Sequence, residues 1–174
     1  VLFVLFLLRQ KRVSDPILPL DLFRARNFWV GNITTTLMYG ALSLNGFVLA
    51  IYLQEQAGLS ATAAGLASLP TTIMMILFSS TAGRLAGSWG PRLFMGVGPI
   101  LMGLGSLMLL LVREDFNYWW QVLPAMIVFG LGLAATVSPL TATILGAIEE
   151  ERSGIASAVN NAISRVAGLI AIAL

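Results

Sequence analysis

Residues 116–148 read FNYWWQVLPAMIVFGLGLAATVSPLTATILGAI, and these 33 residues include no charged side chain. A helix needs about 20 predominantly apolar residues to cross a bilayer. Three more uncharged runs reach that length, at residues 27–54, 56–83 and 93–112. The sequence therefore predicts an all-α fold, a polytopic transmembrane helix bundle.

The composition agrees with this reading and excludes several kinds of function. The 174 residues are 57% hydrophobic and only 10% charged, with a mean hydropathy of +0.88, whereas soluble domains carry about 25% charged residues. Cysteine and histidine are absent, which removes the usual zinc ligands, thiol nucleophiles and Ser-His-Asp triads. We expect no enzyme, no cofactor, no metal site and, without a contiguous basic patch, no nucleic-acid partner.

The apolar runs divide the chain into three parts. Residues 1–8, VLFVLFLL, are too short to cross a membrane and are interpreted as the end of a truncated membrane helix. Residues 9–27 contain Pro16 and Pro19 and mix apolar with charged side chains, as in an interfacial linker. Residues 28–174 form the bundle, with spans expected at 28–53, 61–82, 93–112, 119–147 and 155–174. The chain stops inside an apolar run, so we expect a fragment of a larger protein.

The distribution of basic residues predicts the orientation. If the linker 9–27 is cytoplasmic, that side carries Arg9, Lys11, Arg12, Arg24, Arg26, Arg84, Arg92 and Arg152. The opposite side then carries only Arg113, which is the asymmetry of the positive-inside rule. We expect a multi-pass protein of the cell membrane with residues 9–27 and 83–92 on its cytoplasmic side.

Residues 83–92, GRLAGSWGPR, lie between two predicted spans. One interpretation is a tight turn, because Gly83, Gly87 and Gly90 permit unusual dihedral angles and the arginines anchor the cytoplasmic face. The other is a conformational latch, in which Arg84 and Arg92 meet helix carbonyls or carboxylates in one of two states.

This segment resembles the signature loop of the major facilitator superfamily, G-x-L-A-D-R-x-G-R-K/R. Gly83, Leu85, Ala86, Gly90 and Arg92 match, while Gly87 replaces the aspartate of the signature. The stretches PLDLFRARNF (19–28), YLQEQAGLS (52–60), GLGLAATVSP (130–139) and GIASAVNN (154–161) are similar to the fourteen-span drug/proton antiporter branch. The resemblance implies the C-terminal half of such a transporter without its last helix.

Arg165 is the one basic residue placed within a predicted span. A charged side chain near mid-bilayer should face protein or a water-filled cavity, and Asn161 lies one turn earlier on the same side. One interpretation is that Arg165 and Asn161 line the transport cavity. The alternative is a structural tie between the guanidinium group and helix carbonyls.

The first full span offers a second candidate face. Thr34, Met38, Asn45 and Tyr52 fall in one narrow sector of the helix and would suit a permissive site for amphipathic compounds. The alternative is core packing with Asn45 bonded between helices. Thr136 and Thr143, on the fourth full span, are weaker cavity candidates.

Small residues and prolines predict how the spans pack. Gly96 and Gly103 leave one face of the third span without side chains, and Gly98 and Gly105 do the same on another face. Neighbouring helices are therefore expected to pack closely on both faces. One proline falls in each of four spans and predicts a bend there. These prolines are Pro70, Pro99, Pro124 and Pro139.

The resemblance implies a secondary active transporter that exports drugs or other amphipathic compounds by alternating access, in exchange for protons. Its expected partners are the lipid bilayer, a small amphipathic substrate, protons and the N-terminal half of the same transporter. The predicted spans hold no internal Asp, Glu or His, so we expect the coupling carboxylate outside this chain, with Glu55 a distant second. The alternatives are a truncated membrane scaffold that does not transport, or a major-facilitator carrier for a metabolite.

Overall fold

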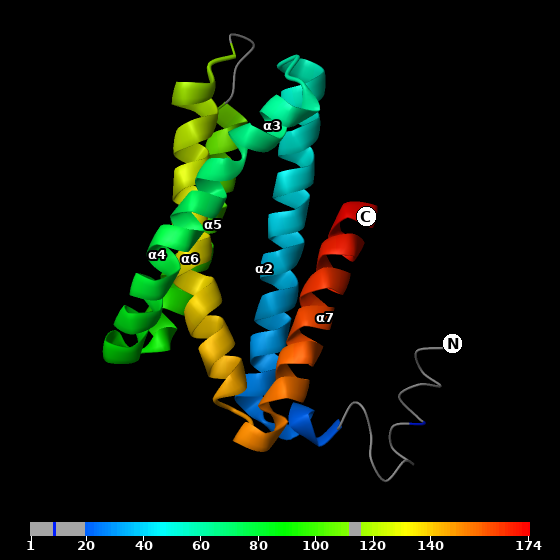
Figure 1. Cartoon of the computed structure of the whole chain (residues 1–174), viewed down its shortest axis with the longest axis vertical. Coiled ribbons are helices and arrows are strands. Elements are labelled where there is room, and N and C mark those ends of the chain that lie inside the picture. The colour runs from blue at the N-terminus through cyan, green and yellow to red at the C-terminus, as the bar shows by residue number, and fades with distance from the viewer. Residues whose placement is uncertain (1–8, 10–19, 112–115) are drawn as a thin grey trace.

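The computed structural model describes residues 9, 20–111 and 116–174. Within these residues, five helical segments are long and apolar enough to cross a membrane, which confirms the predicted all-α bundle (Figure 1). The expected helix remnant at 1–8 and most of the linker 9–27 lie outside the described residues. Large side chains such as Leu110, Trp120 and Leu169 are more than 70% exposed, as expected where lipid is the solvent.

The helices follow one another with short connections. Their bounds are η1 Leu20–Arg24, α2 Arg26–Ile51, η2 Tyr52–Gln56, α3 Ala61–Ala67, α4 Leu69–Trp89, α5 Pro91–Met108, η3 Leu109–Leu111, η4 Tyr118–Val122, α6 Leu123–Leu145, η5 Glu150–Arg152 and α7 Ser153–Ala173. The predicted spans match these bounds within a few residues, apart from the second span.

The second span consists of two helices and is longer than predicted. Ser60 caps α3 by accepting a hydrogen bond from the Ala63 amide at 3.2 Å. The chain then breaks at Ser68, and Pro70 lies in the first turn of α4, where a missing amide hydrogen costs least. Pro124 likewise lies in the first turn of α6. Only two of the four expected bends, at Pro99 and Pro139, therefore fall inside a helix.

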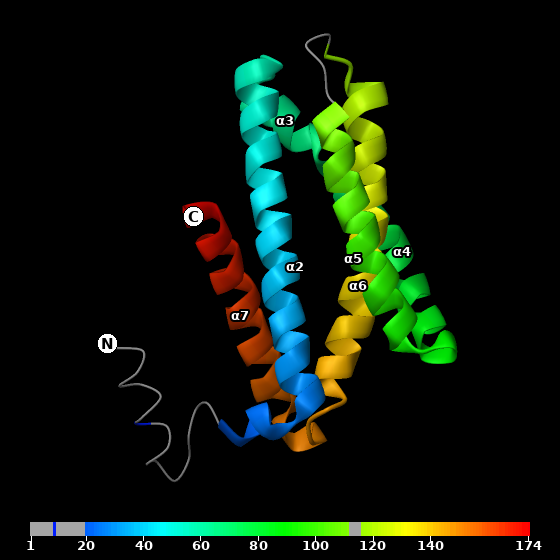
Figure 2. The ribbon, with the colours of Figure 1, turned by 180° about the vertical axis from the view of Figure 1, so that it is seen from behind.

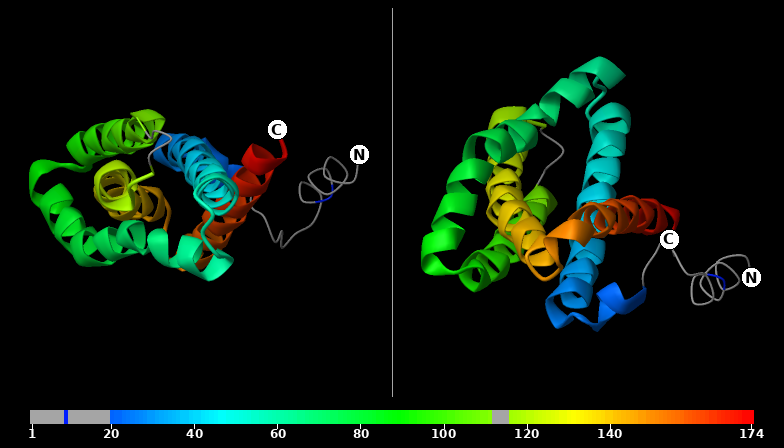
Figure 3. Two further views of the ribbon diagram at one scale, coloured as in Figure 1. Left: turned by 90° about the horizontal axis from the view of Figure 1, so that it is seen from above. Right: turned by 60° about the horizontal axis from the view of Figure 1, so that its bottom comes forward.

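α6 is the central helix and packs against both α5 and α4 (Figure 3, left). Glycine allows the close approach to α5: a Cβ atom on Gly105 would lie 2.7 Å from the Phe129 amide nitrogen, and one on Gly132 would lie 2.6 Å from the Gly98 carbonyl oxygen. Gly96 and Gly103 have no described atom within 4 Å of a Cβ position. Within the described residues, another helix therefore packs against only one of the two glycine faces expected on this span.

α7 packs along α2, and this pair forms a second group beside α4, α5 and α6 (Figure 2). The two groups meet where α6 ends, with Leu22, Phe28, Ile144 and Ala156 in one buried cluster. Away from that junction, the Tyr118 hydroxyl donates a 2.7 Å hydrogen bond to the Ala67 carbonyl and so joins η4 to α3. Near that end, a second buried cluster, which includes Leu53 of η2, Val122 of η4 and Met126 of α6, connects the two groups.

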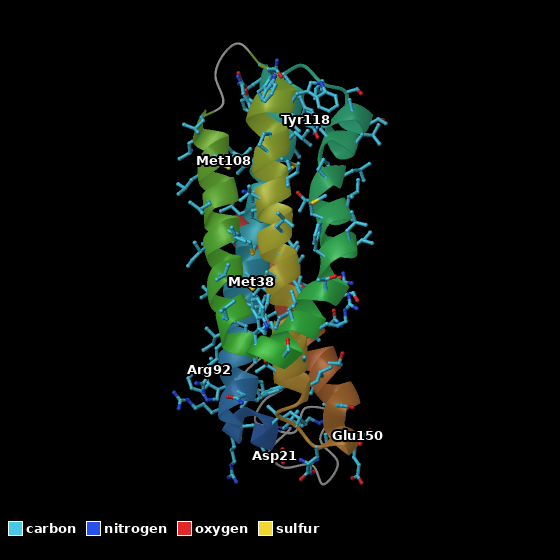
Figure 4. The ribbon with its side chains drawn as sticks, turned by 90° about the vertical axis from the view of Figure 1, so that its left-hand side faces the viewer. Asp21, Met38, Arg92, Met108, Tyr118 and Glu150 are labelled. Atoms are coloured by element: carbon cyan, nitrogen blue, oxygen red, sulfur yellow. The ribbon has the colours of Figure 1, made fainter. Side chains whose placement is uncertain are left out.

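Most of the charged residues in the described chain lie at one end of the bundle. Asp21, Arg92 and Glu150 lie there, and Tyr118 lies toward the other end (Figure 4). We call it the basic end because the helix termini that meet there carry Arg24, Arg26, Arg84, Arg92 and Arg152. Lys11, Arg12 and Arg113, which also entered the predicted orientation, lie outside the described residues.

Candidate functional site

Two cavities open between the helices. The first, the α2–α4–α6 cavity, has a volume of about 340 Å³. Its walls are largely aliphatic, and its polar side chains are Asn45, Gln54, Ser68, Thr71 and Thr72. The Thr71 hydroxyl donates a 3.3 Å hydrogen bond to the Met126 carbonyl and so ties α4 to α6 at the cavity wall. Mostly apolar walls with a few hydrogen-bonding groups are typical of small-molecule sites.

The second cavity, the α2–α5 cavity, lies on another side of α2 and has a volume of about 460 Å³. It is lined by Ala41, Leu44, Asn45, Val48, Leu49, Tyr52, Ser106, Leu109 and Leu110. Asn45, Tyr52 and Ser106 are its polar side chains. The Tyr52 ring also packs against Phe116, with 6.2 Å between the ring centroids.

Asn45 belongs to both cavities. Its amide nitrogen Nδ2 donates a 2.8 Å hydrogen bond to Ser106 Oγ on α5, and the Ser106 hydroxyl donates a 3.0 Å bond to the Met102 carbonyl. This chain of hydrogen bonds links the α2–α7 group to the α4–α5–α6 group. Asn45 and Leu49 together form the wall between the two cavities.

The predicted face of α2 is only partly a cavity wall. Asn45 and Tyr52 line cavities, but Met38 is 5% exposed and belongs to the core. The Thr34 hydroxyl donates a 3.0 Å bond to the Val30 carbonyl of its own helix. The four residues share one sector of α2, but that sector is buried at Met38 and lines cavities at Asn45 and Tyr52.

Thr136 and Thr143 line neither of these cavities. Thr136 is fully buried against Gly98, and its hydroxyl donates a 2.9 Å bond to the Gly132 carbonyl. The Thr143 hydroxyl donates a 2.8 Å bond to the Pro139 carbonyl. Threonine in a helix often satisfies its hydroxyl in this way, by bonding to the carbonyl four residues earlier.

The polar face of α7 that packs inward centres on Asn160, a residue not predicted from the sequence. Asn160 Nδ2 lies 3.1 Å from Asn32 Oδ1 and 2.8 Å from Thr35 Oγ1, and it donates to both. Asn32 and Thr35 are 4% and 1% exposed. Asn161 and Arg165 are exposed on a different face of α7. The sequence pattern that could have predicted this contact is the three-residue spacing of Asn32 and Thr35, which places both residues on one side of α2.

Residues 1–172 match the family described as the Major Facilitator Superfamily. The chain belongs to the Major Facilitator Superfamily. It is 32% identical over 173 residues to the methylenomycin A resistance protein of Bacillus subtilis, a match that covers 99% of this chain and 37% of that protein. It is 28% identical to the riboflavin transporter RibZ of Clostridioides difficile (88% and 34% covered) and 29% identical to the multidrug efflux pump LfrA of Mycolicibacterium smegmatis (90% and 31% covered).

These comparisons confirm the resemblance stated from the sequence. Two of the three relatives carry names of resistance or efflux proteins. The chain spans about a third of the length of these relatives. It is therefore a multi-pass membrane segment that corresponds to part of a major facilitator protein.

The segment that resembles the major facilitator signature is mostly helix, which corrects the predicted ten-residue loop. α4 continues through Gly83 and Gly87 to Trp89, and α5 begins at Pro91. Only Gly90 separates the two helices, and its φ of +90° requires glycine. Gly83 instead lets α4 approach Ser138 of α6. Arg84 and Arg92 are exposed at the basic end.

An ion pair at the basic end of this major facilitator segment was also not predicted. Arg152 Nη1 donates a 2.6 Å hydrogen bond to Asp21 Oδ2, joining residues 131 positions apart. That hydrogen bond holds the pKa of Asp21 below its ordinary value of 3.8. The pair borders a cavity of about 290 Å³ together with Glu149. Among the described residues, the carboxylates form no group of three that could hold a metal ion.

Proposed function

We propose that this chain is part of a secondary active transporter that exports drugs or other amphipathic compounds by alternating access. The α2–α4–α6 cavity is the observation that carries the proposal. It lies within a five-span bundle, its walls are mainly aliphatic, and Asn45, Gln54 and Thr72 offer hydrogen bonds. Such a lining suits molecules that combine an apolar body with a few polar groups.

Alternating access requires a second half against which this bundle moves, and we propose the N-terminal half of the same transporter for that role. Two buried clusters, one around Phe28 and Ile144 and the other around Leu53 and Met126, join the two helix groups near both ends. We therefore propose that the bundle moves largely as one body. In the cell membrane, the basic end would face the cytoplasm by the positive-inside rule.

We further propose that Arg84 and Arg92 contact that second half in one of the two conformations. Both guanidinium groups are exposed at the basic end. Within the described chain, Arg84 makes a 3.5 Å contact with Thr81 Oγ1 of its own helix. Gly90 alone separates the end of α4 from the start of α5, so that both arginines can act on one partner surface.

Proton coupling is proposed to depend on a carboxylate outside these 174 residues. Within the described spans, Glu55, Glu150 and Glu151 lie at helix ends, and arginine stays protonated in the working pH range. Glu55 remains the second candidate because it is exposed on η2, close to both cavities.

The test fills the α2–α4–α6 cavity in the full-length transporter that contains this chain. Gly46 lines the cavity, and a Cβ atom there has nothing within 4 Å, so Gly46→Leu should occupy the cavity without distorting α2. We expect a loss of dye export from cells of at least about tenfold. Gly96→Leu is the matched control because Gly96 is equally open but lines neither cavity. Equal export by both variants would contradict the proposed site.

A metabolite carrier is the second candidate, because one relative is named as a riboflavin transporter. The same cavity could bind such a compound through Asn45 and Gln54. Uptake and export of riboflavin and of a hydrophobic dye, measured in the same cells, would separate the candidates. Transport of riboflavin alone would favour the carrier.

A further inference from the structure

Arg165 differs from every other charged residue in the described spans by its depth. The others lie within about a turn and a half of a span end, as Arg84 does in α4. Arg165 lies 12 residues after the start of α7 at Ser153, which corresponds to about 18 Å along the helix. The hydrocarbon core of a bilayer is about 30 Å thick. The guanidinium group is therefore attached near mid-membrane.

The helix orientation separates Arg165 from the face that packs against α2. Asn160 and Ala171 point to α2, through the hydrogen bonds of Asn160 to Asn32 and Thr35 and the close approach of Ala171 to Gly40. Asn161 is rotated by about 100° from Asn160, and Arg165 lies one turn after Asn161. Both side chains are exposed. Gly154 and Ala158, which are also exposed, continue this face toward the start of α7.

No hydrogen bond or ion pair joins Arg165 to any described residue. The described spans also contain no carboxylate at this depth, because their acidic residues all lie at span ends. A charged side chain at this depth is costly unless it faces a partner or a water-filled cavity. The planar fork of N–H donors of arginine matches a carboxylate in a bidentate arrangement. Charge complementarity at this face therefore points to an anionic group.

We propose that Arg165, assisted by Asn161, binds the acidic group of a transported amphipathic anion, so that carboxylate-bearing compounds are a substrate class of the transporter. This inference rests on the proposed transport function. Arg165 neutralises the anion at mid-membrane, and the Asn161 amide donates a further hydrogen bond.

The experiment compares export of fluorescein, an anion, with export of ethidium, a cation, by the full-length transporter in membrane vesicles. Arg165→Gln should lower fluorescein export at least tenfold, mainly by raising KM, and should leave ethidium export within twofold of the parent protein. Arg165→Lys keeps the charge and should restore at least a third of fluorescein export. Arg26→Gln removes one positive charge at the exposed start of α2 and should change neither rate.

Three results would overturn the inference. The first is fluorescein export by Arg165→Gln within twofold of the parent. The second is an equal loss of both activities at normal membrane abundance, which would mean that Arg165 pairs with a carboxylate of the remaining transporter. The third is a parent protein that exports ethidium but not fluorescein. A parent that exports neither compound would contradict the proposed function itself, and this inference with it.

Discussion

At the scale of single residues, the neighbours Asn160 and Asn161 have opposite roles in the packing. Asn160 donates to Asn32 and Thr35 between α7 and α2, whereas Asn161 is exposed. Asn160→Leu would leave the buried Asn32 oxygen without this donor, so we expect a loss of about 1–2 kcal/mol in stability. Denaturation of the purified full-length protein in detergent measures it. Asn161→Leu is the control, and an equal loss in both variants would refute the assignment.

Asn45 is the residue at which the two cavities meet. Asn45→Ala removes the hydrogen bond to Ser106 and the amide that lines both cavities, so we expect a changed ratio of export rates among dyes, by about tenfold for some compounds. Ser106→Ala breaks the same bond but keeps the Asn45 side chain. A changed ratio in both variants would assign the effect to the bond, and an unchanged ratio in Asn45→Ala would remove Asn45 from the site.

Asp21 gives the basic end a dependence on pH. Its pKa is lowered by the hydrogen bond from Arg152, and a carboxyl with a lowered pKa stabilises the folded state above its unfolded value of 3.8. That contribution is lost as the pH falls through the lowered pKa. The difference in melting temperature between the parent and Asp21→Asn should therefore be present at about pH 6 and should shrink as the pH is lowered below 3.8. A difference that is unchanged by pH would contradict the ion pair.

At the scale of helices, the two glycine faces of α5 predict opposite responses to substitution. A Cβ atom on Gly98 would collide with Thr136 of α6, whereas one on Gly96 would meet nothing within 4 Å. We expect Gly98→Ala to destabilise the protein by about 1–3 kcal/mol because α5 must move away from α6. Gly96→Ala, the control, should be neutral or slightly stabilising. Thermal unfolding in detergent distinguishes them, and equal melting temperatures would show that the contact is not tight.

Helix breaks show how far local sequence rules extend. Pro70 and Pro124 each open a helix, because the first turn is where proline costs least. An uncharged run shows that a segment crosses the membrane, but it does not show where the backbone turns within it. The glycine-rich segment 83–92 proved to be mostly helix, because Gly83 and Gly87 lie inside α4 and, within this segment, Gly90 alone adopts a positive φ.

At the scale of the whole molecule, proton coupling should survive changes to the acidic residues of this chain. Glu55→Gln in the full-length transporter should leave dye export sensitive to a protonophore, with a rate within about twofold of the parent. Neutralising the membrane carboxylates of the remaining transporter should abolish that sensitivity. Proton-driven export that persists without those upstream carboxylates would contradict the proposal, and a loss in Glu55→Gln alone would move the coupling site to η2.

The sequence by itself determined the environment of the protein, its fold class and its family. Four uncharged runs and a fifth apolar run that contains Arg165 predict five helical spans, because a peptide backbone in lipid must satisfy its own hydrogen bonds. The order of short motifs indicated the major facilitator superfamily, and residues 1–172 match it. Arg165 was also identifiable from the sequence, because one charge within an apolar run is conspicuous.

Only the tertiary structure decided which polar residues face one another. Met38 and Asn45 share a sector of α2, yet α6 covers the first and leaves the second in a cavity wall. Asn160 and Asn161 differ by one position, and only the packing of α7 against α2 decides which is bonded. The reason is physical: helical period fixes the angle between side chains on one helix, whereas the rotation and separation of neighbouring helices depend on contacts between distant residues, such as those of Gly98 with Thr136.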